Sequence, residues 1–391
     1  MTSHPASPVS LFDTTLRDGE QTPGLRMSPA HKLRIAELLE RLGVDVIEAG
    51  FPAASPVEIE TLQAIGTRLR RTTLCALARA TAKDIEAAAK ALETAQKPRL
   101  HTFIATSPLH RQHKLRLDKT QVIERAVQAV TLARRYCDEV QFSAEDAFRT
   151  EPEFLAEVLQ AAVDAGATIL NVPDTVGYAL PHEIRQRFAL LQEAVIPRTS
   201  TPLIWSAHCH DDLGLATANS LAAVQGGARQ VEGCVLGLGE RAGNAALEEI
   251  IMALETRLPE YRAAHAQPPQ IGPVCRDIAE LLGLAIAPGK AIVGANAFAH
   301  ESGIHQDGVL KHASTYEVIT PERVGWQRST DRLHLGKLSG RAALFATLQQ
   351  LGITVAEQQK TATFERFKAL ASDVDSSIDE ATLRQWFGQG G

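Results

Sequence analysis

Short hydrophobic runs alternate with amphipathic stretches from the start of the chain to about residue 258. The amphipathic stretches, such as HKLRIAELLERL and PEFLAEVLQAAVDAG, repeat their apolar residues at helical spacing. The hydrophobic runs are short enough for buried strands, and there are eight of them: residues 9–12, 44–50, 72–78, 99–105, 138–144, 167–173, 202–208 and 230–237. Strands that alternate with helices in this way predict a parallel sheet built through right-handed crossovers.

Two architectures fit this alternation: an open doubly wound sheet and a closed (β/α)₈ TIM barrel. Polar residues follow most of the eight predicted strands. Barrel active sites lie at the C-terminal ends of the strands, whereas an open sheet concentrates its chemistry at one switch point. Eight strand–helix units within about 250 residues also match the usual barrel size. We therefore expect a catalytic TIM barrel over residues 1–270.

The alternation stops near residue 260, and helical patterns without strands follow. Residues 275–286, 340–352 and 356–373 have helical spacing, and a glycine-rich irregular stretch separates the first of these from the others. We expect C-terminal helical subdomains over residues 271–391, with a linker loop at residues 288–308.

Composition narrows the class of protein. The net charge of −6 argues against nucleic acid or an anionic membrane as a partner. No apolar run approaches the roughly 18 residues of a membrane helix, and the first ten residues lack the features of a signal peptide. The five cysteines are scattered without CxxC spacing, which favours reduced thiols. We expect a cytoplasmic protein.

The segment His208-Cys209-His210-Asp211-Asp212 ends the seventh predicted strand and is the strongest local signal. Residues i and i+2 of a strand point to the same face, so both imidazoles can reach one metal ion in the barrel mouth. The alternative is a pair of hydrogen-bonded histidines without a ligand.

A polar turn, Asp13 to Gln21, follows the first predicted strand. One of its carboxylates can complete a mixed nitrogen and oxygen metal site, and Arg17 can stabilise an oxygen that gains charge in a transition state. Glu48 is a carboxylate inside an apolar run, which is costly unless it is paired, and Arg17 is the expected partner. A purely structural salt bridge is the alternative.

Other candidates are individually weaker. The segment 237–244 places glycines before a helix, where backbone N–H groups suit an anion, and Asn244 offers a side-chain oxygen. His305, near Asp307, is a plausible proton-transfer group in a loop of the C-terminal part. The remaining candidates can hydrogen-bond a substrate or the metal shell, or be structural: Arg79, His101, Ser143, Glu145 and Thr175.

Two of these segments resemble hallmarks of the α-isopropylmalate and homocitrate synthase family, which belongs to the metallolyase barrels with an Asp-Arg-Glu triad. They are Leu16-Arg17-Asp18-Gly19-x-Gln21, followed after ten residues by Lys32, and Trp205-x-x-His208-x-His210-Asp211-Asp212. The resemblance implies the triad Asp18, Arg17 and Glu48. It also implies a divalent metal, Mn²⁺ or Zn²⁺ with Mg²⁺ and Co²⁺ as alternatives. The implied ligands are Asp18, His208, His210 and Asn244.

Residues 48–52, 101–107 and 303–308 resemble the isopropylmalate synthases more than the homocitrate synthases. The implied reaction is a Claisen-type condensation of acetyl-CoA with 2-oxoisovalerate, which gives 2-isopropylmalate and CoA in leucine biosynthesis. Most such enzymes continue into a regulatory domain, and we expect a short form without it. The open alternatives are another 2-oxo acid, as in homocitrate synthase, a C–C lyase on the same barrel, and a metal-binding barrel without catalysis.

On this interpretation the candidate residues take distinct roles. Arg17 and Glu48 act in catalysis, and His305 from the second subunit of a homodimer is the expected base, with Glu145 as its rival. The expected substrate-binding residues are Arg79, His101, Ser143 and Thr175. Gly237, Gly239 and Gly243 are expected to bind the CoA thioester.

Overall fold

The computed structural model describes residues 6–197, 202–327, 335–373 and 378–388. The chain divides into two compact units, residues 1–285 and 286–391. Within the described residues, no helix is both long enough and apolar enough to cross a bilayer.

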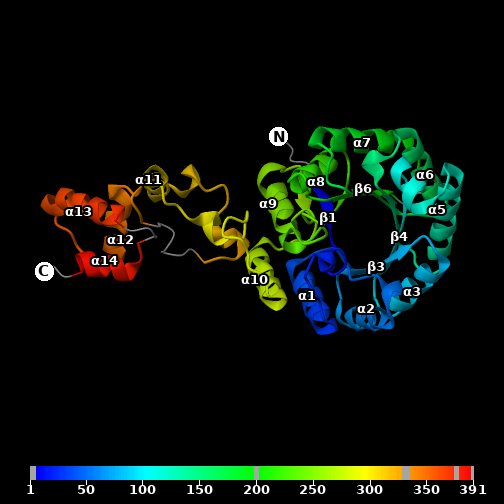
Figure 1. The fold of residues 1–391 in the computed structure, drawn as a ribbon, viewed down its shortest axis with the longest axis horizontal. Coiled ribbons are helices and arrows are strands. Elements are labelled where there is room, and N and C mark those ends of the chain that lie inside the picture. The colour runs from blue at the N-terminus through cyan, green and yellow to red at the C-terminus, as the bar shows by residue number, and fades with distance from the viewer. Residues whose placement is uncertain (1–5, 198–201, 328–334, 374–377, 389–391) are drawn as a thin grey trace. The chain divides into compact units, whose positions relative to one another are not determined.

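Eight parallel strands form a closed ring in the first unit (Figure 1). They are β1 (Ser7–Asp13), β2 (Val46–Glu48), β3 (Thr73–Arg79), β4 (Pro98–Ala105), β5 (Val140–Glu145), β6 (Ile169–Asp174), β7 (Ile204–Cys209) and β8 (Gln230–Gly233). The ring closes because β1 pairs in parallel with both β2 and β8. The TIM barrel predicted from the alternating pattern is confirmed, and each predicted strand overlaps one of these eight.

Helices lie between the strands and surround the ring (Figure 1). They are α1 (Pro29–Leu42), α2 (Pro56–Arg68), α3 (Ala82–Leu92), α4 (Pro108–His110), α5 (Lys119–Ala133), α6 (Pro152–Asp164), α7 (Pro181–Ala194), α8 (Ala216–Gln225) and α9 (Leu247–Arg257). Local signals set their ends. Ser28 caps α1 by accepting a hydrogen bond from the His31 N–H, and Gly43 ends it at φ 89°.

One short strand was not predicted. β9 (Tyr261–Ala263) pairs in parallel with the first residues of β1, outside the closed ring, and α10 (Ile271–Leu282) follows it. This segment packs tightly against the start of the barrel, since a Cβ on Gly43 would lie 2.2 Å from the carbonyl oxygen of His265.

Polar side chains form a connected layer inside the barrel. Gln230 accepts a hydrogen bond from Arg99 at 2.7 Å and donates to Gln141 at 3.0 Å. Gln141 and Ser206 in turn donate to Glu232, at 2.7 and 2.9 Å. Successive side chains of a strand alternate between its two faces, so the inward positions carry this layer while the outward ones pack against the helices.

The second unit has its own small core. Its helices are α11 (Gly303–Lys311), α12 (Arg341–Gln350), α13 (Lys360–Ser372) and α14 (Glu380–Phe387). Buried side chains of α12, α13 and α14, among them Leu344, Phe367 and Leu383, pack together. The segment that the sequence pattern presents as an irregular loop differs from that expectation, because residues 303–311 are helical.

Candidate active site

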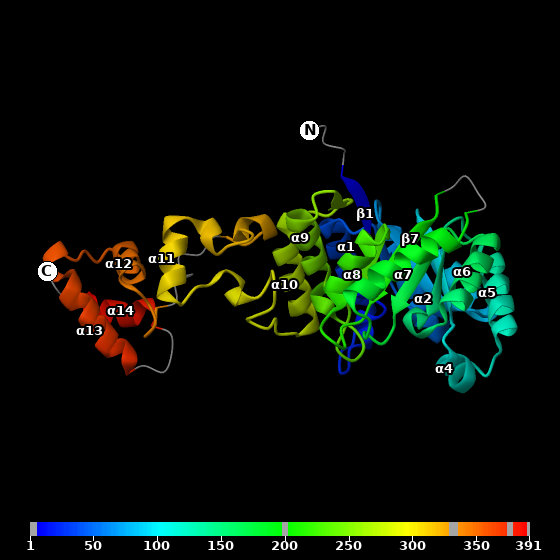
Figure 2. The same cartoon turned by 90° about the horizontal axis from the view of Figure 1, so that it is seen from above.

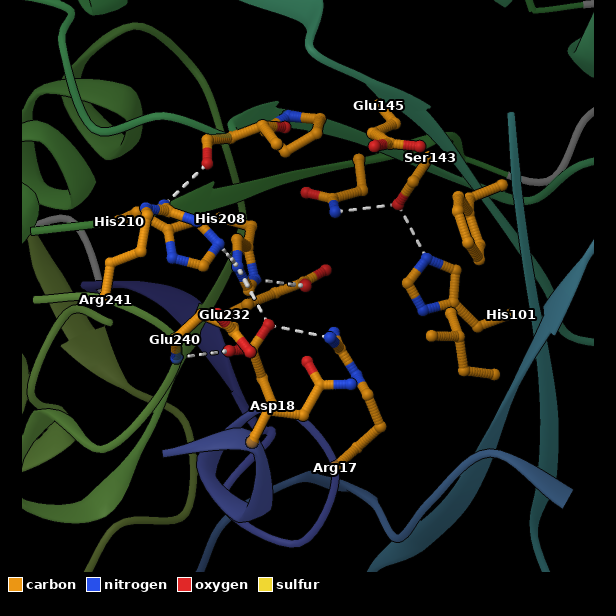
Figure 3. Close-up of a pocket in the computed structure, with 16 residues that line it drawn as sticks. Arg17, Asp18, His101, Ser143, Glu145, His208, His210, Glu232, Glu240 and Arg241 are labelled. Atoms are coloured by element: carbon orange, nitrogen blue, oxygen red, sulfur yellow. Dashed lines mark hydrogen bonds and ion pairs between the residues drawn. The ribbon is translucent and has the colours of Figure 1, made fainter. Parts of the chain in front are cut away.

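A cavity of about 230 Å³ opens at the C-terminal ends of the barrel strands (Figure 3). Most of the residues singled out from the sequence line it: Arg17, Asp18, His101, Ser143, Glu145, Thr175, His208 and His210. They come from segments far apart in the chain, and the barrel brings them together because its strands end around one opening.

Asp18, His208 and His210 converge on one point. Each offers one ligand atom, and these atoms all lie within 4.8 Å of one another. The Nε2 atoms of the two histidines are 3.1 Å apart, and His208 Nε2 is 3.9 Å from Asp18 Oδ2. The placement of both imidazoles on one face, as predicted from their i and i+2 positions, is confirmed.

The surroundings of this triad fit a divalent metal. His208 Nδ1 lies 3.1 Å from Glu232 Oε2, so Nδ1–H donates to that carboxylate and Nε2 keeps its lone pair for a metal (Figure 3). Asn244 Oδ1 is buried and accepts no hydrogen bond from the described residues, although Asn244 Nδ2 donates to Asp18 at 2.9 Å. The two imidazoles, the carboxylate and this oxygen form a donor set that suits a divalent transition metal.

The charges of these groups favour metal binding. Burial alone would raise the pKa of Asp18, but Arg17 and the two histidines hold that pKa well below its usual range. Burial lowers the pKa of His210 to about 3, and the neighbouring His208 acts in the same direction. Near neutral pH the site therefore presents an ionised carboxylate and a neutral His210 imidazole.

Arg17 is held between two carboxylates. Its Nε lies 2.6 Å from Glu48 Oε2. Its Nη1 lies 2.7 Å from Asp18 Oδ2 (Figure 3). The pairing of Arg17 with Glu48, predicted from the cost of an isolated buried carboxylate, is confirmed. Burial would raise the pKa of Glu48, yet Arg17 and His101 lower it to about 2.

A chain of hydrogen bonds continues from Glu48 across the barrel. Glu48 Oε1 is 2.6 Å from His101 Nδ1, and His101 Nε2 is 2.6 Å from Ser143 Oγ. Asn171 Nδ2 then donates to Ser143 Oγ at 2.8 Å. Because Glu48 is ionised, it accepts from His101 Nδ1–H, and His101 Nε2 faces the Ser143 hydroxyl. His101, Ser143 and Asn171 therefore form a hydrogen-bonding wall of the cavity.

The glycine-rich segment 237–244 brings Asn244 against Asp18. A Cβ on Gly239 would lie 2.1 Å from Asn244 Nδ2 and 3.0 Å from Asp18 Oδ1, and one on Gly243 would lie 2.0 Å from the Gly237 carbonyl oxygen. The N–H groups of Gly237, Gly239 and Gly243 donate to Cys234 O, Thr22 Oγ1 and Glu240 O. The glycines are thus needed for close packing, and their N–H groups already have acceptors within the protein.

Arg241 joins three loops at the mouth. Its φ of 53° lies in the left-handed region, which is unusual for a residue with a side chain. Its guanidinium contacts both carboxylate oxygens of Asp212, at 2.7 and 3.0 Å, and donates to the Thr175 carbonyl at 2.9 Å. Thr175 Oγ1 accepts from the Asp146 N–H at 2.9 Å.

Two candidates from the sequence lie elsewhere. Arg79 does not line the cavity, because its guanidinium pairs with Asp84 at the start of α3 and its side chain is 61% exposed. His305 belongs to the second unit, where its ring stacks on Tyr316 with 4.1 Å between the ring centroids. Asp307, which the sequence places near His305, pairs with Lys311 at 2.6 Å.

Among the cavity residues that were not singled out from the sequence, Glu232 and Asn171 contact the candidate site residues. Glu232 orients His208, and Asn171 ends the hydrogen-bond chain from Glu48. Both interrupt otherwise apolar strand segments, QVEGCVLG and ATILNVP. A polar residue inside an apolar strand segment is the signal that identified Glu48. It could have identified Glu232 and Asn171 as well.

Comparison with known proteins shows which enzyme families this chain resembles. Residues 8–272 match the HMGL-like family, and residues 292–375 match the family described as homocitrate synthase post-HMGL domain-like. The crystal structure of the Bacillus subtilis HMG-CoA lyase has a similar fold, with a TM-score of 0.61 at 21% identity, over 72% of this chain and 97% of that one. Fold and site together define an HMGL-like barrel enzyme with a triad able to hold a divalent metal.

The relatives define the family more narrowly. The chain is 54% identical to the 2-isopropylmalate synthase of Chromobacterium violaceum over 374 residues, which cover 95% of this chain and 72% of that protein. It is 53% identical to the 2-isopropylmalate synthase of Neisseria meningitidis serogroup A over 377 residues, with coverage of 96% and 72%. The chain therefore belongs to the 2-isopropylmalate synthase family, an acyl-CoA-transferring enzyme family, which confirms the resemblance read from the motifs.

Proposed function

We propose that this enzyme condenses acetyl-CoA with 2-oxoisovalerate to give 2-isopropylmalate and CoA, a reaction of leucine biosynthesis. The observation that carries the proposal is the convergence of Asp18, His208 and His210 beside Arg17 in the barrel mouth. It is supported by identity above 50% to enzymes named for this product.

Asp18, His208 and His210 would hold the divalent metal, with Asn244 as a further oxygen ligand. The donor set suits Mn²⁺ or Zn²⁺, with Mg²⁺ and Co²⁺ as alternatives. When bound, such a metal polarises the keto group of a 2-oxo acid as a Lewis acid.

Arg17 stabilises the charge that develops during the condensation. Glu48 and Asp18 orient its guanidinium before any substrate arrives. It then donates to the keto oxygen as that oxygen becomes an alkoxide, which is where a preorganised cation has most effect. His101, Ser143 and Thr175 provide the hydrogen-bonding wall against which the 2-oxo acid binds.

A base must remove a proton from the acetyl methyl group. We assign this step to His305 of the partner subunit in a homodimer, with Glu145 as the rival because it lines the cavity. The enolate carbon attacks the keto carbon, and water then hydrolyses the thioester and releases CoA. His305→Ala tests this: full activity of that variant favours Glu145. If it is inactive, activity recovered on mixing it with an inactive His208→Ala protein supports a site completed by two subunits.

The cavity favours a 2-oxo acid with a branched apolar tail. Leu77, Phe103 and Pro173 contribute apolar lining. A 2-oxo dicarboxylate such as 2-oxoglutarate would need a cation or several donors for its distal carboxylate. The two arginines of the lining, Arg17 and Arg241, are already paired with carboxylates.

CoA-thiol release by the purified, metal-loaded enzyme tests the proposal. Acetyl-CoA is supplied with 2-oxoisovalerate, 2-oxoglutarate, pyruvate or a longer 2-oxo acid in parallel. Release that is fastest with 2-oxoisovalerate supports the assignment, and release only with 2-oxoglutarate favours homocitrate synthase. No release with any 2-oxo acid would overturn condensation and favour a C–C lyase.

We place the reaction in the cytoplasm. All five cysteines are buried, and reduced thiols are expected in this compartment.

A further inference from the structure

The connection between β4 and α5 carries a local positive charge. Residues 110–119 include four lysines and arginines, two histidines and one acidic residue, in a chain whose net charge is −6. A concentration of charge opposite in sign to the rest of the protein attracts anions to that place.

This connection leaves the barrel on the side of the active site. Figure 2 shows α4 at the end of the barrel opposite to the one where β1 begins. A π-helix, Arg111–Leu115, follows α4 and ends at Arg116, whose φ of 54° and ψ of 49° are left-handed. π-Helices are rare and occur often at functional sites, and a left-handed conformation costs a non-glycine residue about 1–2 kcal/mol.

The connection is anchored through only some of its cations. Arg111 is buried, donates to both oxygens of Glu151 at 2.7 and 3.0 Å, and stacks on the ring of Phe154. Lys119 also pairs with Glu151, at 3.3 Å. These two cations share the single carboxylate of Glu151, which offsets one of their two charges and helps to hold the backbone in place.

The remaining lysine and arginine side chains of the connection are exposed, and Lys114 stays 51% exposed although it forms an ion pair. Lys114 Nζ lies 2.6 Å from Glu145 Oε1, and Glu145 lines the cavity. His113 and Arg116 are exposed, and neither has an ion-pair partner within the residues that the structure describes. Exposed basic side chains thus flank Lys114, which contacts the cavity lining through Glu145.

We propose that Lys114 and Arg116, called here the rim cations, bind the phosphate groups of the CoA thioester together with the neighbouring His113. This inference rests on the proposed function, in which the acetyl group reacts inside the cavity. The flexible pantetheine arm then leads outward to a pyrophosphate and a 3′-phosphate, the strongly anionic groups that arginine and lysine recognise. The glycine-rich segment is a poorer candidate for this role, since the N–H groups of Gly237, Gly239 and Gly243 already have acceptors.

The test uses two variants and one control. Arg116→Asn, and the double variant His113→Asn with Arg116→Asn, remove charge and place at residue 116 a side chain that tolerates the left-handed conformation. Arg135→Asn removes an exposed arginine just beyond the far end of α5, about 22 Å from its first residue at 1.5 Å per residue. Thermal unfolding checks that each protein is folded.

Two measurements are made on each protein. The first is the Kd for adenosine 3′,5′-bisphosphate, a probe with the nucleotide phosphates but no thioester. The second is the KM for acetyl-CoA and for S-acetylpantetheine, which lacks the nucleotide. Loss of one charge-assisted contact should raise the Kd and the acetyl-CoA KM about tenfold. The KM values for S-acetylpantetheine and for the 2-oxo acid should not change, and Arg135→Asn should behave as wild type.

The outcomes distinguish a failure of the phosphate-binding proposal from a failure of the proposed condensation. Wild-type CoA release together with an unchanged Kd and acetyl-CoA KM in both variants would overturn the phosphate assignment alone. No binding of the bisphosphate to wild type would overturn it as well. Bisphosphate binding that the variants weaken, in an enzyme that releases no CoA with any 2-oxo acid, would support the rim cations and reject the condensation.

Discussion

Replacement of Glu48 by glutamine should cost this enzyme both stability and turnover. Glu48 is fully buried and accepts three hydrogen bonds, from Arg17 Nε at 2.6 Å, His101 Nδ1 at 2.6 Å and Thr14 Oγ1 at 2.9 Å. Glutamine keeps the size but removes the charge and replaces one acceptor by an NH₂ group. That group cannot face the Arg17 N–H, so it must face His101 and force its tautomer to change.

The expected loss of stability follows from the charge of Arg17, which Glu48→Gln leaves without one of its two carboxylate partners. Breaking a buried ion pair costs about 3–5 kcal/mol, and we expect about 3 kcal/mol because Asp18 still contacts Arg17 at 2.7 Å. Turnover should fall about 100-fold, the effect of losing one well-placed donor in a transition state. Urea denaturation of the metal-free protein measures the first quantity, and kcat with 2-oxoisovalerate measures the second.

Glu139→Gln is the matched control. Glu139 also pairs with an arginine, Arg99 at 2.9 Å, but its side chain is 50% exposed. An exposed pair contributes about 1 kcal/mol or less, so this variant should stay close to wild type. If Glu48→Gln lost no more stability than Glu139→Gln and kept its kcat, the role assigned to the Arg17–Glu48 pair would be refuted.

Three further predictions concern the metal site, the pH dependence and the substrate wall. In Gly239→Ala the new Cβ would lie 2.1 Å from Asn244 Nδ2, so Asn244 must move. Calorimetry should show Mn²⁺ binding weakened about 10–100-fold. Gly24→Ala is the control, because its Cβ meets nothing within 4 Å, and its Mn²⁺ affinity should not change. Burial raises the pKa of Asp13 from 3.8 to about 7. Between these pH values the folded state binds one proton more than the unfolded state. The free energy of unfolding therefore falls by about 4 kcal/mol as pH rises through this range. Asp13→Asn should remove that loss in denaturation series from pH 4 to 8, and parallel curves for both proteins would contradict it. Arg79→Ala should change the KM for the 2-oxo acid less than twofold, because Arg79 lies outside the cavity, and a tenfold rise would show that it contacts the substrate.

The barrel and the convergence of the two histidines were predictable because their signals are local. A run of eight strands alternating with helices admits few topologies, and His208 and His210 share a strand face through a spacing of two residues. The Arg17–Glu48 pair followed from the cost of an unpaired buried carboxylate, which depends little on the details of packing.

The remaining features depend on tertiary contacts that a single sequence does not display. Arg79 turns to Asp84, five residues further on, rather than into the cavity. Residues 303–311 are helical despite two glycines, and both glycines make close contacts: a Cβ on Gly303 would lie 2.7 Å from Gly340 N, and one on Gly308 would lie 2.6 Å from the Tyr316 ring. Packing therefore selects glycine at these positions although it weakens the local helical signal.

Product analysis tests the central claim most directly. The metal-loaded enzyme is incubated with acetyl-CoA labelled with ¹³C in the methyl group and with 2-oxoisovalerate, and the product is identified by NMR and mass spectrometry. We predict labelled 2-isopropylmalate in amounts equal to the CoA released, and none from the His208→Ala variant. CoA release without a new carbon–carbon bond, or the same labelled product from His208→Ala, would contradict the account.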